Sequence, residues 1–550
     1  MMLAFRTGDE VRLQWSYLDP KFTEYKEIVK GLRVRFWNKD KKVWVIPYDV
    51  DLLDELDRQV GNIRYDPALW VQYQQDKKSR DAALESKTRG DGDLRGYVPI
   101  TEPWPHQRAA FAAAYDLPGY ALFWEMGTGK TKVPIDLAIA QGMKHVLVIA
   151  PNEIIYNWFD EVQTHGGEKA VVLDGTVASR RAKFEWPMPR FVVHNAESLP
   201  HIVDTLRRPW DMIVVDEATT FKNPSAERTK ALMSLAPFAN KRIVMTGTPV
   251  TQHVYDVYAP MEFLKPGIFG RYGYFKWRYF ELVWDKVLRK EVLRPRADTL
   301  PELLRILDTM SYRVTKKEVL PWLPEKLPPQ RRMVELHGDQ LAAYRQMDRA
   351  YRVYLKTLVG DIQTHAVQVV TQLLRLSEIA SGFVRDEKSD RIHWFPDHAK
   401  GHVTDGLVEE LVTDGKKVVI FAVWRPEIEH YADRYAQYGS AVLYGGMQPT
   451  DRQAIVRAFQ SEDEPRVLVC QIGSAGRGIN LTAASTAIYT SRDYSLEHWL
   501  QSQDRLHRAG QKEEVNLVTV MGKDTADLHV EAILSGKATL AEIVNKDKER

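Results

Sequence analysis

The residues best suited to chemistry in this chain are two arginines near its end, Arg505 and Arg508, within the segment Gln503–Gln511 (QDRLHRAGQ). Their i, i+3 spacing predicts that both guanidinium groups lie on one face of a helix. A guanidinium stays charged and offers a rigid fork of donors that matches phosphate oxygens. A pair at this spacing is more often a solvated face or two salt bridges, so its meaning depends on a phosphate-binding partner elsewhere.

Such a partner lies far upstream, in a Gly-rich loop that follows a strand-like segment and precedes the helical pattern of Val133–Ala140. Glycines let backbone N–H groups approach phosphate oxygens, the lysine can reach the terminal phosphates, and the threonine hydroxyl can ligate Mg²⁺. An ordinary Gly-rich turn is the alternative, because the strict motif wants glycine where this chain has Trp124. The predicted nucleotide-binding residues are Gly127, Thr128, Gly129, Lys130 and Thr131.

Two acidic residues, Asp216 and Glu217, directly follow the apolar segment Met212–Val215. Asp216 is predicted to hold Mg²⁺, usually through water, and Glu217 to orient or activate the attacking water. An isolated Asp-Glu pair is usually a solvated loop, but the upstream phosphate loop favours the functional interpretation. Thr246–Pro249 (TGTP) follows another apolar segment, and its two hydroxyls could connect the acidic pair to the second half of the chain.

Two series of short apolar segments alternate with helical patterns, and most of these segments lack polar alternation. Continuous apolar strands between helices are typical of parallel sheets covered on both faces. The predicted fold class is therefore α/β, with two tandem parallel-sheet lobes, helical insertions and a small α+β N-terminal domain. The predicted strands are 121–124, 145–150, 190–193, 212–215 and 242–245, then 418–422, 441–444, 467–471, 486–490 and 515–520.

The domain boundaries follow from these patterns. In the N-terminal domain we expect a helix over 25–30, a hairpin of strands over 32–36 and 43–47, and a second helix over 52–60. The predicted domains are 1–60, a linker over 61–98 (with an exposed helix as the alternative for 72–96), a first lobe over 99–265, helical and basic or aromatic insertions over 266–400, a second lobe over 401–530 and a helical tail over 531–550.

Composition sets the class of protein. The 550 residues include 76 basic and 74 acidic side chains, so any nucleic-acid surface must come from local clustering. One cysteine, Cys470, excludes an internal disulfide framework and fits a reducing compartment. The sequence has no long apolar run and no evident signal peptide. We therefore expect a cytoplasmic protein, from a bacterium or from a virus in its host's cytoplasm.

In their order, these segments resemble the superfamily 2 helicase motor and, within it, the Swi/Snf-type DNA translocases, over roughly residues 100–530. The match includes Pro105–Gln107, Ile149–Pro151 with Asn157-Trp158, Asn195–Leu199, Asp216–Thr219, Arg313–Lys317 with Leu323–Lys326, Gly473–Leu481, and Gln503–Gln511 with Gln501. It departs from the family at Trp124 and Thr128 in the phosphate loop, at Thr219 in place of histidine, and at Arg492–Ser495 in place of a Trp-Asn-Pro element.

The resemblance implies two RecA-like lobes and further site residues. Gln107 would read the adenine, Gly478 would contact the nucleotide, and Arg505 and Arg508 would act as arginine fingers. The expected DNA contacts in the lobes are Pro151, Asn152, Asn195, Gly445 and Ser474. The N-terminal domain, with Arg35–Trp37 and Val43–Val45, resembles the HepA-related (HARP) domain of annealing helicases; a small hairpin packed on the motor is the alternative.

A basic and aromatic segment, residues 271–296, is the other candidate DNA surface. It carries eight basic and three acidic residues, a local net charge of +5. Basic side chains track phosphates, and exposed aromatic rings could stack on bases. Large aromatic rings are more often buried in a core, which is the alternative for these. The basic residues predicted to contact DNA are Arg278, Arg289 and Lys290.

The predicted function is an ATP-dependent motor that requires Mg²⁺. Its predicted catalytic residues are Lys130, Glu217, Arg505 and Arg508. It would hydrolyse ATP on duplex, forked or branched DNA as a monomer, and would remodel that DNA by fork reversal, annealing or branch migration. One alternative is a helicase that separates DNA or RNA strands. An alternative of another class is a nucleotide-gated DNA-binding switch that does not translocate.

Overall fold

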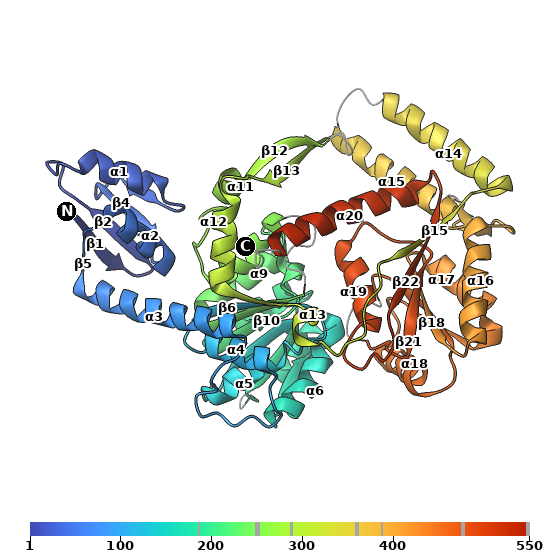
Figure 1. Cartoon of the computed structure of the whole chain (residues 1–550), viewed down its shortest axis with the longest axis horizontal. Helices are drawn as coiled ribbons and strands as arrows, with labels where there is room; N and C mark the ends of the chain where they lie inside the picture. The colour runs from blue at the N-terminus through green and yellow to red at the C-terminus, as the bar shows by residue number, and fades with distance from the viewer. Residues whose placement is uncertain are drawn as a thin grey trace. The chain divides into compact units, whose positions relative to one another are not determined.

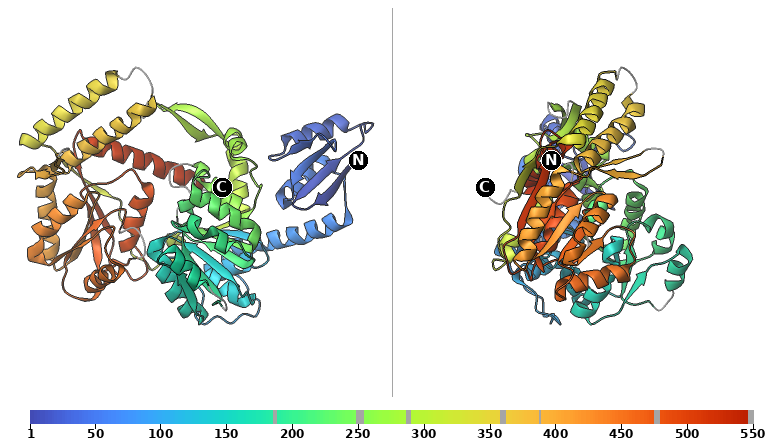
Figure 2. Two further views of the ribbon diagram at one scale, coloured as in Figure 1. Left: turned by 180° about the vertical axis from the view of Figure 1, so that it is seen from behind. Right: turned by 90° about the vertical axis from the view of Figure 1, so that its right-hand side faces the viewer.

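The computed structural model describes residues 1–184, 188–247, 254–285, 290–357, 362–386, 389–474 and 479–545. The chain forms two compact units, which meet in the sequence between Thr315 and Lys316; the short segment Met126–Thr128 is grouped with the second unit. Figures 1 and 2 show the helices and strands of both. Within the described residues, no helix combines the length and hydropathy needed to span a bilayer.

The first unit contains a seven-stranded sheet of order β14-β6-β11-β10-β7-β9-β8, in which every strand pair is parallel. All residues of β6, β7 and β9 are buried, as expected for strands covered by helices on both faces. The strands are β6 (Gly119–Trp124), β7 (Val146–Ala150), β8 (Ala170–Leu173), β9 (Phe191–Asn195), β10 (Trp210–Val215), β11 (Ala239–Thr246) and β14 (Ser311–Val314).

Helices follow most strands of this sheet, as the predicted alternation requires (Figure 1). They are α4 (Pro105–Tyr115), α5 (Lys132–Ala140), α6 (Ile155–Gly166), α7 (Val177–Lys183), α8 (Leu199–Leu206), α9 (Glu227–Leu235), α10 (Tyr258–Leu264), α11 (Tyr272–Tyr279) and α12 (Leu300–Met310). A separate antiparallel pair, β12 (Phe280–Asp285) and β13 (Lys290–Pro295), lies between α11 and α12 in the sequence. The five predicted strands of this lobe are confirmed, whereas β8 and β14 were not predicted.

The second unit contains a six-stranded parallel sheet of order β15-β22-β21-β18-β20-β19. Alternate residues of its central strands enter two separate cores: Ile420 and Val469 lie in one, and Phe421 and Cys470 in the other. The strands are β15 (Gln330–Val334), β18 (Lys417–Ala422), β19 (Ser440–Leu443), β20 (Val467–Gln471), β21 (Ala484–Tyr489) and β22 (Asn516–Gly522). The five predicted strands are confirmed, and so is the two-lobe α/β fold class.

The helices of the second unit are α13 (Lys316–Val319), α14 (Gly338–Thr357), α15 (Ile362–Ala380), α16 (Ala399–Thr413), α17 (Arg425–Arg434), α18 (Pro449–Ser461), α19 (Leu496–Leu506) and α20 (Ala526–Asn545). A short antiparallel pair, β16 (Phe383–Arg385) and β17 (Ile392–Trp394), precedes α16. In parallel sheets covered by helices, ligands bind outside the carboxyl ends of the strands. Each sheet therefore has one edge at which loop residues from distant parts of the sequence meet.

The N-terminal domain is a mixed five-stranded sheet of order β3-β4-β2-β1-β5, with helices α1 and α2. Its elements are β1 (Met2–Thr7), β2 (Glu10–Gln14), α1 (Phe22–Gly31), β3 (Phe36–Asn38), β4 (Val43–Pro47), α2 (Val50–Val60) and β5 (Ile63–Tyr65), and α3 (Pro67–Arg89) follows. Both predicted helices and the second strand of the predicted hairpin, β4, are confirmed, and β4 pairs with an antiparallel partner, β3. Residues 61–98, expected to be a linker, hold β5 and α3.

The strand predicted over 32–36 is wrong. Residues 32–34 form a bend, and the strand starts only at Phe36. Leu32 and Val34 are both buried although they belong to no strand. The apolar alternation of this segment therefore reflects packing of the turn after α1 rather than sheet pairing.

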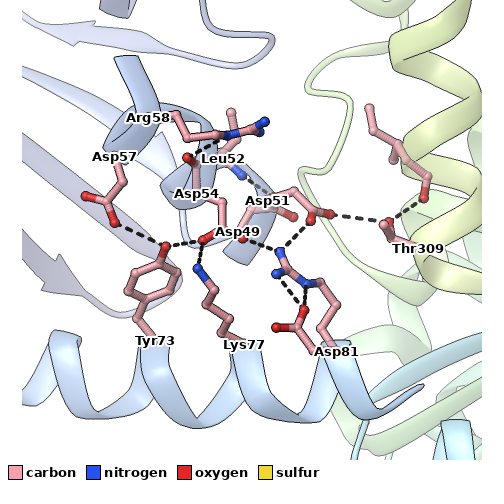
Figure 3. A network of polar contacts seen from close by, with 12 residues as sticks. Asp49, Asp51, Leu52, Asp54, Asp57, Arg58, Tyr73, Lys77, Asp81 and Thr309 are labelled. Atoms are coloured by element: carbon pink, nitrogen blue, oxygen red, sulfur yellow. Dashed lines mark hydrogen bonds and ion pairs between the residues drawn. The ribbon is translucent and has the colours of Figure 1, made fainter. Parts of the chain in front are cut away.

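A polar network joins the acidic side of α2 to α3 (Figure 3). Arg80 of α3 lies 2.8 Å from Asp51 and 2.6 Å from Asp54, and Lys77 lies 2.6 Å from Asp54. The Thr309 hydroxyl of α12 donates to Asp51 over 3.2 Å. The network therefore connects the N-terminal domain to helices that belong to the same unit as the first lobe.

A second connection is buried. Asp49, at the start of α2, forms ion pairs with both Arg33 and Lys265, and its carboxylate accepts a 2.8 Å bond from the Leu52 amide. Asp49 and Arg33 are 2% and 1% exposed. Burial alone would raise the pKa of the Asp49 carboxyl, but Arg33 and Lys265 outweigh it and hold the pKa well below its ordinary value. Lys265 follows α10, so this cluster also connects the domain to the first lobe.

Asp49→Ala is expected to destabilise the N-terminal domain by about 3–5 kcal/mol, because it leaves the buried Arg33 charge without its partner. The measurement is the urea dependence of hydrogen-exchange protection in α2. In wild type, the stabilisation from Asp49 is complete above its unfolded pKa, about 4, and is lost as pH falls through the lower folded value.

The matched control is Asp308→Ala, which removes the partner of Lys87 from a carboxylate that is 59% exposed. Its expected effect is within about 1 kcal/mol, since exposed ion pairs contribute little. If the urea concentration at which α2 loses half of its hydrogen-exchange protection were the same in the Asp49 and Asp308 variants, the buried cluster would not stabilise the N-terminal domain.

Candidate nucleotide-binding site

The predicted site residues of the first lobe follow strands that lie side by side in the sheet. The phosphate loop follows β6, Thr246 ends β11, and Asp216 follows β10, and these strands are neighbours in the order β6-β11-β10. The strands are parallel, so their carboxyl ends meet at one edge. The sheet therefore brings together three segments that are separated by more than a hundred residues of sequence in total.

The phosphate loop is shaped by its glycines and by one glutamine. Gly127 and Gly129 adopt positive φ angles of 81° and 76°, which glycine reaches without steric cost. The Gln107 amide nitrogen donates to the Gly129 carbonyl over 2.9 Å, and its amide oxygen accepts from the Trp104 amide over 2.8 Å. A Cβ at Gly129 would lie 2.4 Å from the Gln107 amide nitrogen. Glycine is therefore needed there for space as well as for its backbone angle.

Gln107 thus has a contact that the sequence did not indicate. Its amide nitrogen bonds the loop at Gly129, which ties α4 to the Gly-rich turn, while its amide oxygen accepts from the Trp104 amide at the start of α4 itself. Its predicted role in reading adenine stays a prediction.

Lys130 points back into the loop. Its ammonium donates to the Trp124 carbonyl over 2.7 Å, and the residue is 9% exposed. To reach a phosphate, this ammonium would exchange a carbonyl partner for a charged oxygen, which accepts a stronger bond. The Trp124 ring is buried against His106, with ring centroids 4.8 Å apart, so this departure from the strict motif acts as packing beneath the loop.

The acidic pair occupies a strained turn at the end of β10. Glu217 has φ 46° and ψ 59°, the left-handed region that non-glycine residues rarely adopt. Asp216 accepts a 2.9 Å bond from the Glu217 amide and a second 2.9 Å bond from the Trp158 indole N–H. The Thr246 hydroxyl lies 3.5 Å from the Glu217 carboxylate. Thr246 is therefore in contact with the acidic pair, as expected for the start of the TGTP segment.

The oxygen groups at this edge fit Mg²⁺. The metal prefers oxygen ligands and usually keeps several waters. Asp216 supplies a carboxylate at this edge, and the Glu217 amide and the Trp158 indole N–H each donate to one of its oxygens. Thr131 stands directly before α5, and its hydroxyl makes no capping bond to that helix. Asp216 and Thr131 are therefore a chemically suitable pair, one carboxylate and one hydroxyl, for the predicted metal.

The two arginines do not share a helical face, so that prediction is wrong in its local geometry. α19 ends at Leu506, and Arg508 lies in the turn beyond it, because the chain leaves the helix at His507. The turn nevertheless brings both guanidiniums to one acceptor: Arg505 and Arg508 each donate to the Ile479 carbonyl over 3.3 Å. The pair is therefore formed by convergence on a backbone carbonyl rather than by helical spacing.

Two lysines brace this arginine segment, and sequence analysis gave them no such role. Lys316 lies 2.5 Å from the Asp504 carboxylate and donates to the His507 carbonyl, while Lys326 donates to the Gln503 side chain over 3.0 Å. Burial alone would raise the pKa of Asp504, but Lys316 and Lys326 outweigh it and lower that pKa. Lys316 belongs to the matched segment Arg313–Lys317 and Lys326 to the matched segment Leu323–Lys326. Membership of these segments was the one feature of the sequence that could have indicated a role for the two lysines.

The predicted DNA contacts of the lobes gather at the carboxyl ends of strands. In the first lobe, Pro151 and Asn152 follow β7 and Asn195 ends β9; the Asn195 amide donates to the Asn152 side chain over 3.2 Å. In the second lobe, the Gly445 amide and the Ser474 hydroxyl both donate to the Gln471 side chain, over 3.0 and 2.8 Å. Each predicted set is thus brought together within its own lobe, and DNA contact by either stays a prediction.

The basic and aromatic segment divides between core and surface. Phe275, Tyr279 and Phe280 are buried, as the alternative interpretation expected, whereas Trp277 and Trp284 are 65% and 61% exposed. Arg278 is committed to an ion pair with Glu302 at 2.5 Å, which limits its availability for a phosphate. Predicted residues outside the described part of the chain are Thr248, Arg289 and Gly478, and of Lys290 only the backbone is described.

Comparisons with known proteins agree on the family. Residues 55–382 match the SNF2-related domain, and residues 402–510 match the helicase conserved C-terminal domain. An uncharacterized ATP-dependent helicase of Mycoplasma genitalium is 25% identical over 435 residues, which cover 76% of this chain and 40% of that protein. The DNA annealing helicase and endonuclease ZRANB3 of Mus musculus is 26% identical over 431 residues, 75% of this chain and 38% of that protein.

The chain thus spans about two fifths of the length of these curated relatives. Among solved structures, the Sulfolobus solfataricus SWI2/SNF2 ATPase core in complex with dsDNA aligns with 82% of this chain and 96% of its own. Its sequence identity is 23% and its TM-score 0.39.

Proposed function

Because this chain belongs to the SNF2-related family and also carries the helicase C-terminal domain, we propose that it is an ATP-dependent motor that acts on DNA. The observation that carries the proposal is the arrangement at one sheet edge. A Gly-rich loop with its lysine, a hydroxyl and an acidic pair follow three adjacent parallel strands, and Thr246 contacts Glu217. These are the groups that phosphoryl transfer from a nucleotide requires.

The roles of the first-lobe residues follow from their chemistry. The loop amides and Lys130 bind the phosphates, and Asp216 with Thr131 supplies oxygen ligands for Mg²⁺. When bound, Mg²⁺ neutralises charge on the phosphate oxygens. Glu217 accepts a proton from, or orients, the attacking water, and its strained backbone with the Thr246 contact holds its carboxylate in place.

Arg505 and Arg508 complete the proposed site from the second lobe. Their guanidiniums converge on one carbonyl within the second lobe, so both can act together on the negative charge of a γ-phosphoryl group. A split site of this kind makes hydrolysis depend on lobe closure, and closure can be used to step along a strand. The Lys316 and Lys326 brace supports this role, because it limits the motion of the segment that carries both arginines.

The proposed track is duplex DNA, held mainly through its backbone. Asn152 and Asn195 in one lobe, and Gly445 and Ser474 in the other, offer polar groups at strand ends that suit phosphate contacts. Such contacts would make binding strongly salt-dependent and weakly sequence-dependent.

The length of the track tests this function. ATP turnover is measured at saturating ATP with linear duplexes of increasing length, compared at equal total base pairs. A translocating motor is expected to hydrolyse faster on long duplexes, because end release interrupts short tracks. Turnover that is stimulated by DNA but independent of its length would favour a nucleotide-gated switch, and the motor proposal would be rejected.

We further propose that the preferred substrate is forked or branched DNA and that the outcome is annealing or fork remodelling. The support is the similarity to relatives named as DNA annealing helicases and the resemblance of the N-terminal domain to the HARP domain. Comparing ATPase stimulation by single strands, duplex, forks and four-way junctions tests this step. Equal stimulation by all duplex-containing substrates would restrict the proposal to a general duplex motor.

A further inference from the structure

Trp158 lies in contact with the acidic pair, although the family resemblance grouped Asn157-Trp158 with a segment that contacts a nucleic-acid strand. Trp158 is 1% exposed and belongs to the buried stripe of α6, with Ile155 and Val162. Its ring is therefore part of the lobe core and is not available to stack on a base. The indole N–H is the polar group that this ring carries into the core, and it needs an acceptor there.

That acceptor is the carboxylate predicted to bind Mg²⁺. The Trp158 Nε1 donates to Asp216 Oδ2 over 2.9 Å, and the Glu217 amide donates to Asp216 Oδ1 over 2.9 Å. One donor on each oxygen fixes the carboxylate plane, because rotation about the Cβ–Cγ bond would break both bonds. Asp216 is 6% exposed, so water competes little for these positions.

We propose that Trp158 is a positioning residue for Asp216: its indole N–H holds the carboxylate in the orientation that binds Mg²⁺ with a nucleotide. The ligand of a metal is commonly oriented by a group behind it, and loss of such a group lowers metal affinity by about 10- to 100-fold. Here that group comes from a core helix, α6, which follows β7, the neighbour of β10 in the sheet. The packing of α6 would thus set the geometry of the metal ligand. The inference rests on the proposed nucleotide site.

The test is an equilibrium binding measurement rather than turnover. ADP binding to the full chain is measured by calorimetry over a series of Mg²⁺ concentrations and in EDTA. For Trp158→Phe, which keeps an aromatic ring but removes the donor, the Mg²⁺ concentration for half-maximal enhancement is expected to rise about 10- to 100-fold. ADP affinity in EDTA is expected to stay within about twofold, because the phosphate loop is untouched.

Trp210→Phe is the matched control. Trp210 is also 1% exposed in the same lobe, and its indole N–H donates over 2.9 Å, but to the Leu206 carbonyl. Its Mg²⁺ dependence is expected to match that of wild type. If Trp158→Phe fails to fold, benzothienylalanine at position 158 keeps the shape of the indole and removes only the N–H, and the same rise is expected.

The outcomes separate this inference from the function on which it rests. A Trp158 variant with the Mg²⁺ dependence of wild type, or a rise that Trp210→Phe reproduces, overturns the positioning role and leaves the nucleotide site intact. Wild-type chain that binds ADP without any dependence on Mg²⁺ overturns the metal role of Asp216 and the role of Trp158 together.

Discussion

Lys130→Ala is expected to reduce DNA-stimulated ATP hydrolysis to background. Lys130 is the cation of the Gly-rich loop, and alanine can neither bind the terminal phosphates nor bond the Trp124 carbonyl. The loss of a charged donor at the transferring group removes electrostatic stabilisation of the transition state. The measurement is the rate of phosphate release at saturating duplex DNA, with ATP varied to separate KM from kcat.

The control for this variant is Lys144→Ala, which removes an exposed lysine from the same lobe. It is expected to hydrolyse ATP as wild type does. The circular dichroism spectrum and melting temperature of Lys130→Ala should also match those of wild type, so that a loss of rate is not a loss of fold. Turnover within about twofold of wild type in Lys130→Ala would contradict the assignment of the phosphate loop.

Arg508→Ala is expected to lower kcat by about 10³- to 10⁵-fold, the range for an arginine finger in related phosphoryl-transfer enzymes. Nucleotide affinity should change far less, because the finger acts on charge that develops during transfer. Arg508 is the better of the two arginines to substitute. Arg505 is buried in the last turn of α19, so its loss would also disturb packing. Single-turnover hydrolysis and ADP binding together give the two quantities.

Arg457→Ala, which removes an exposed arginine of α18, is the control in the same lobe and is expected to leave kcat unchanged. A proportional loss of ADP affinity and kcat in Arg508→Ala would instead indicate that the arginine supports the lobe or binds the ground state. An unchanged kcat would remove Arg508 from the site.

Much of the fold could be predicted because its central strands are apolar along their whole length. Segments such as Val146–Ala150 and Val467–Cys470 are apolar and buried throughout, the pattern of strands in a parallel sheet covered on both faces. In the sheets of the two lobes, the missed strands lie at edges: β8 and β14 are the two edges of the first sheet, and β15 is an edge of the second. In the N-terminal domain β1 and β2 were also missed, although both lie inside their sheet. An edge strand is exposed on one side, so it carries a weaker apolar signal.

The sequence offered candidate site residues but not the contacts that hold them. Motif order selected Lys130, Asp216 and Arg508 as candidates, since their chemistry is local. The partners that hold them come from other elements: Gln107 for the loop, Trp158 for Asp216, and Lys316 for the arginine segment. Helical spacing predicted the wrong geometry for Arg508 because the end of α19 depends on how Lys316 and Pro324 hold His507.

The proposed coupling of ATP hydrolysis to DNA is tested most directly by the rate of phosphate release with and without a long duplex. The rate is measured with the wild-type chain at saturating ATP and Mg²⁺, in low salt. The expected rate of phosphate release is about tenfold or more higher with DNA than without it. This stimulation is expected to fall steeply as salt is added, because binding through phosphate contacts releases counterions. The same rate with and without duplex DNA would contradict the account.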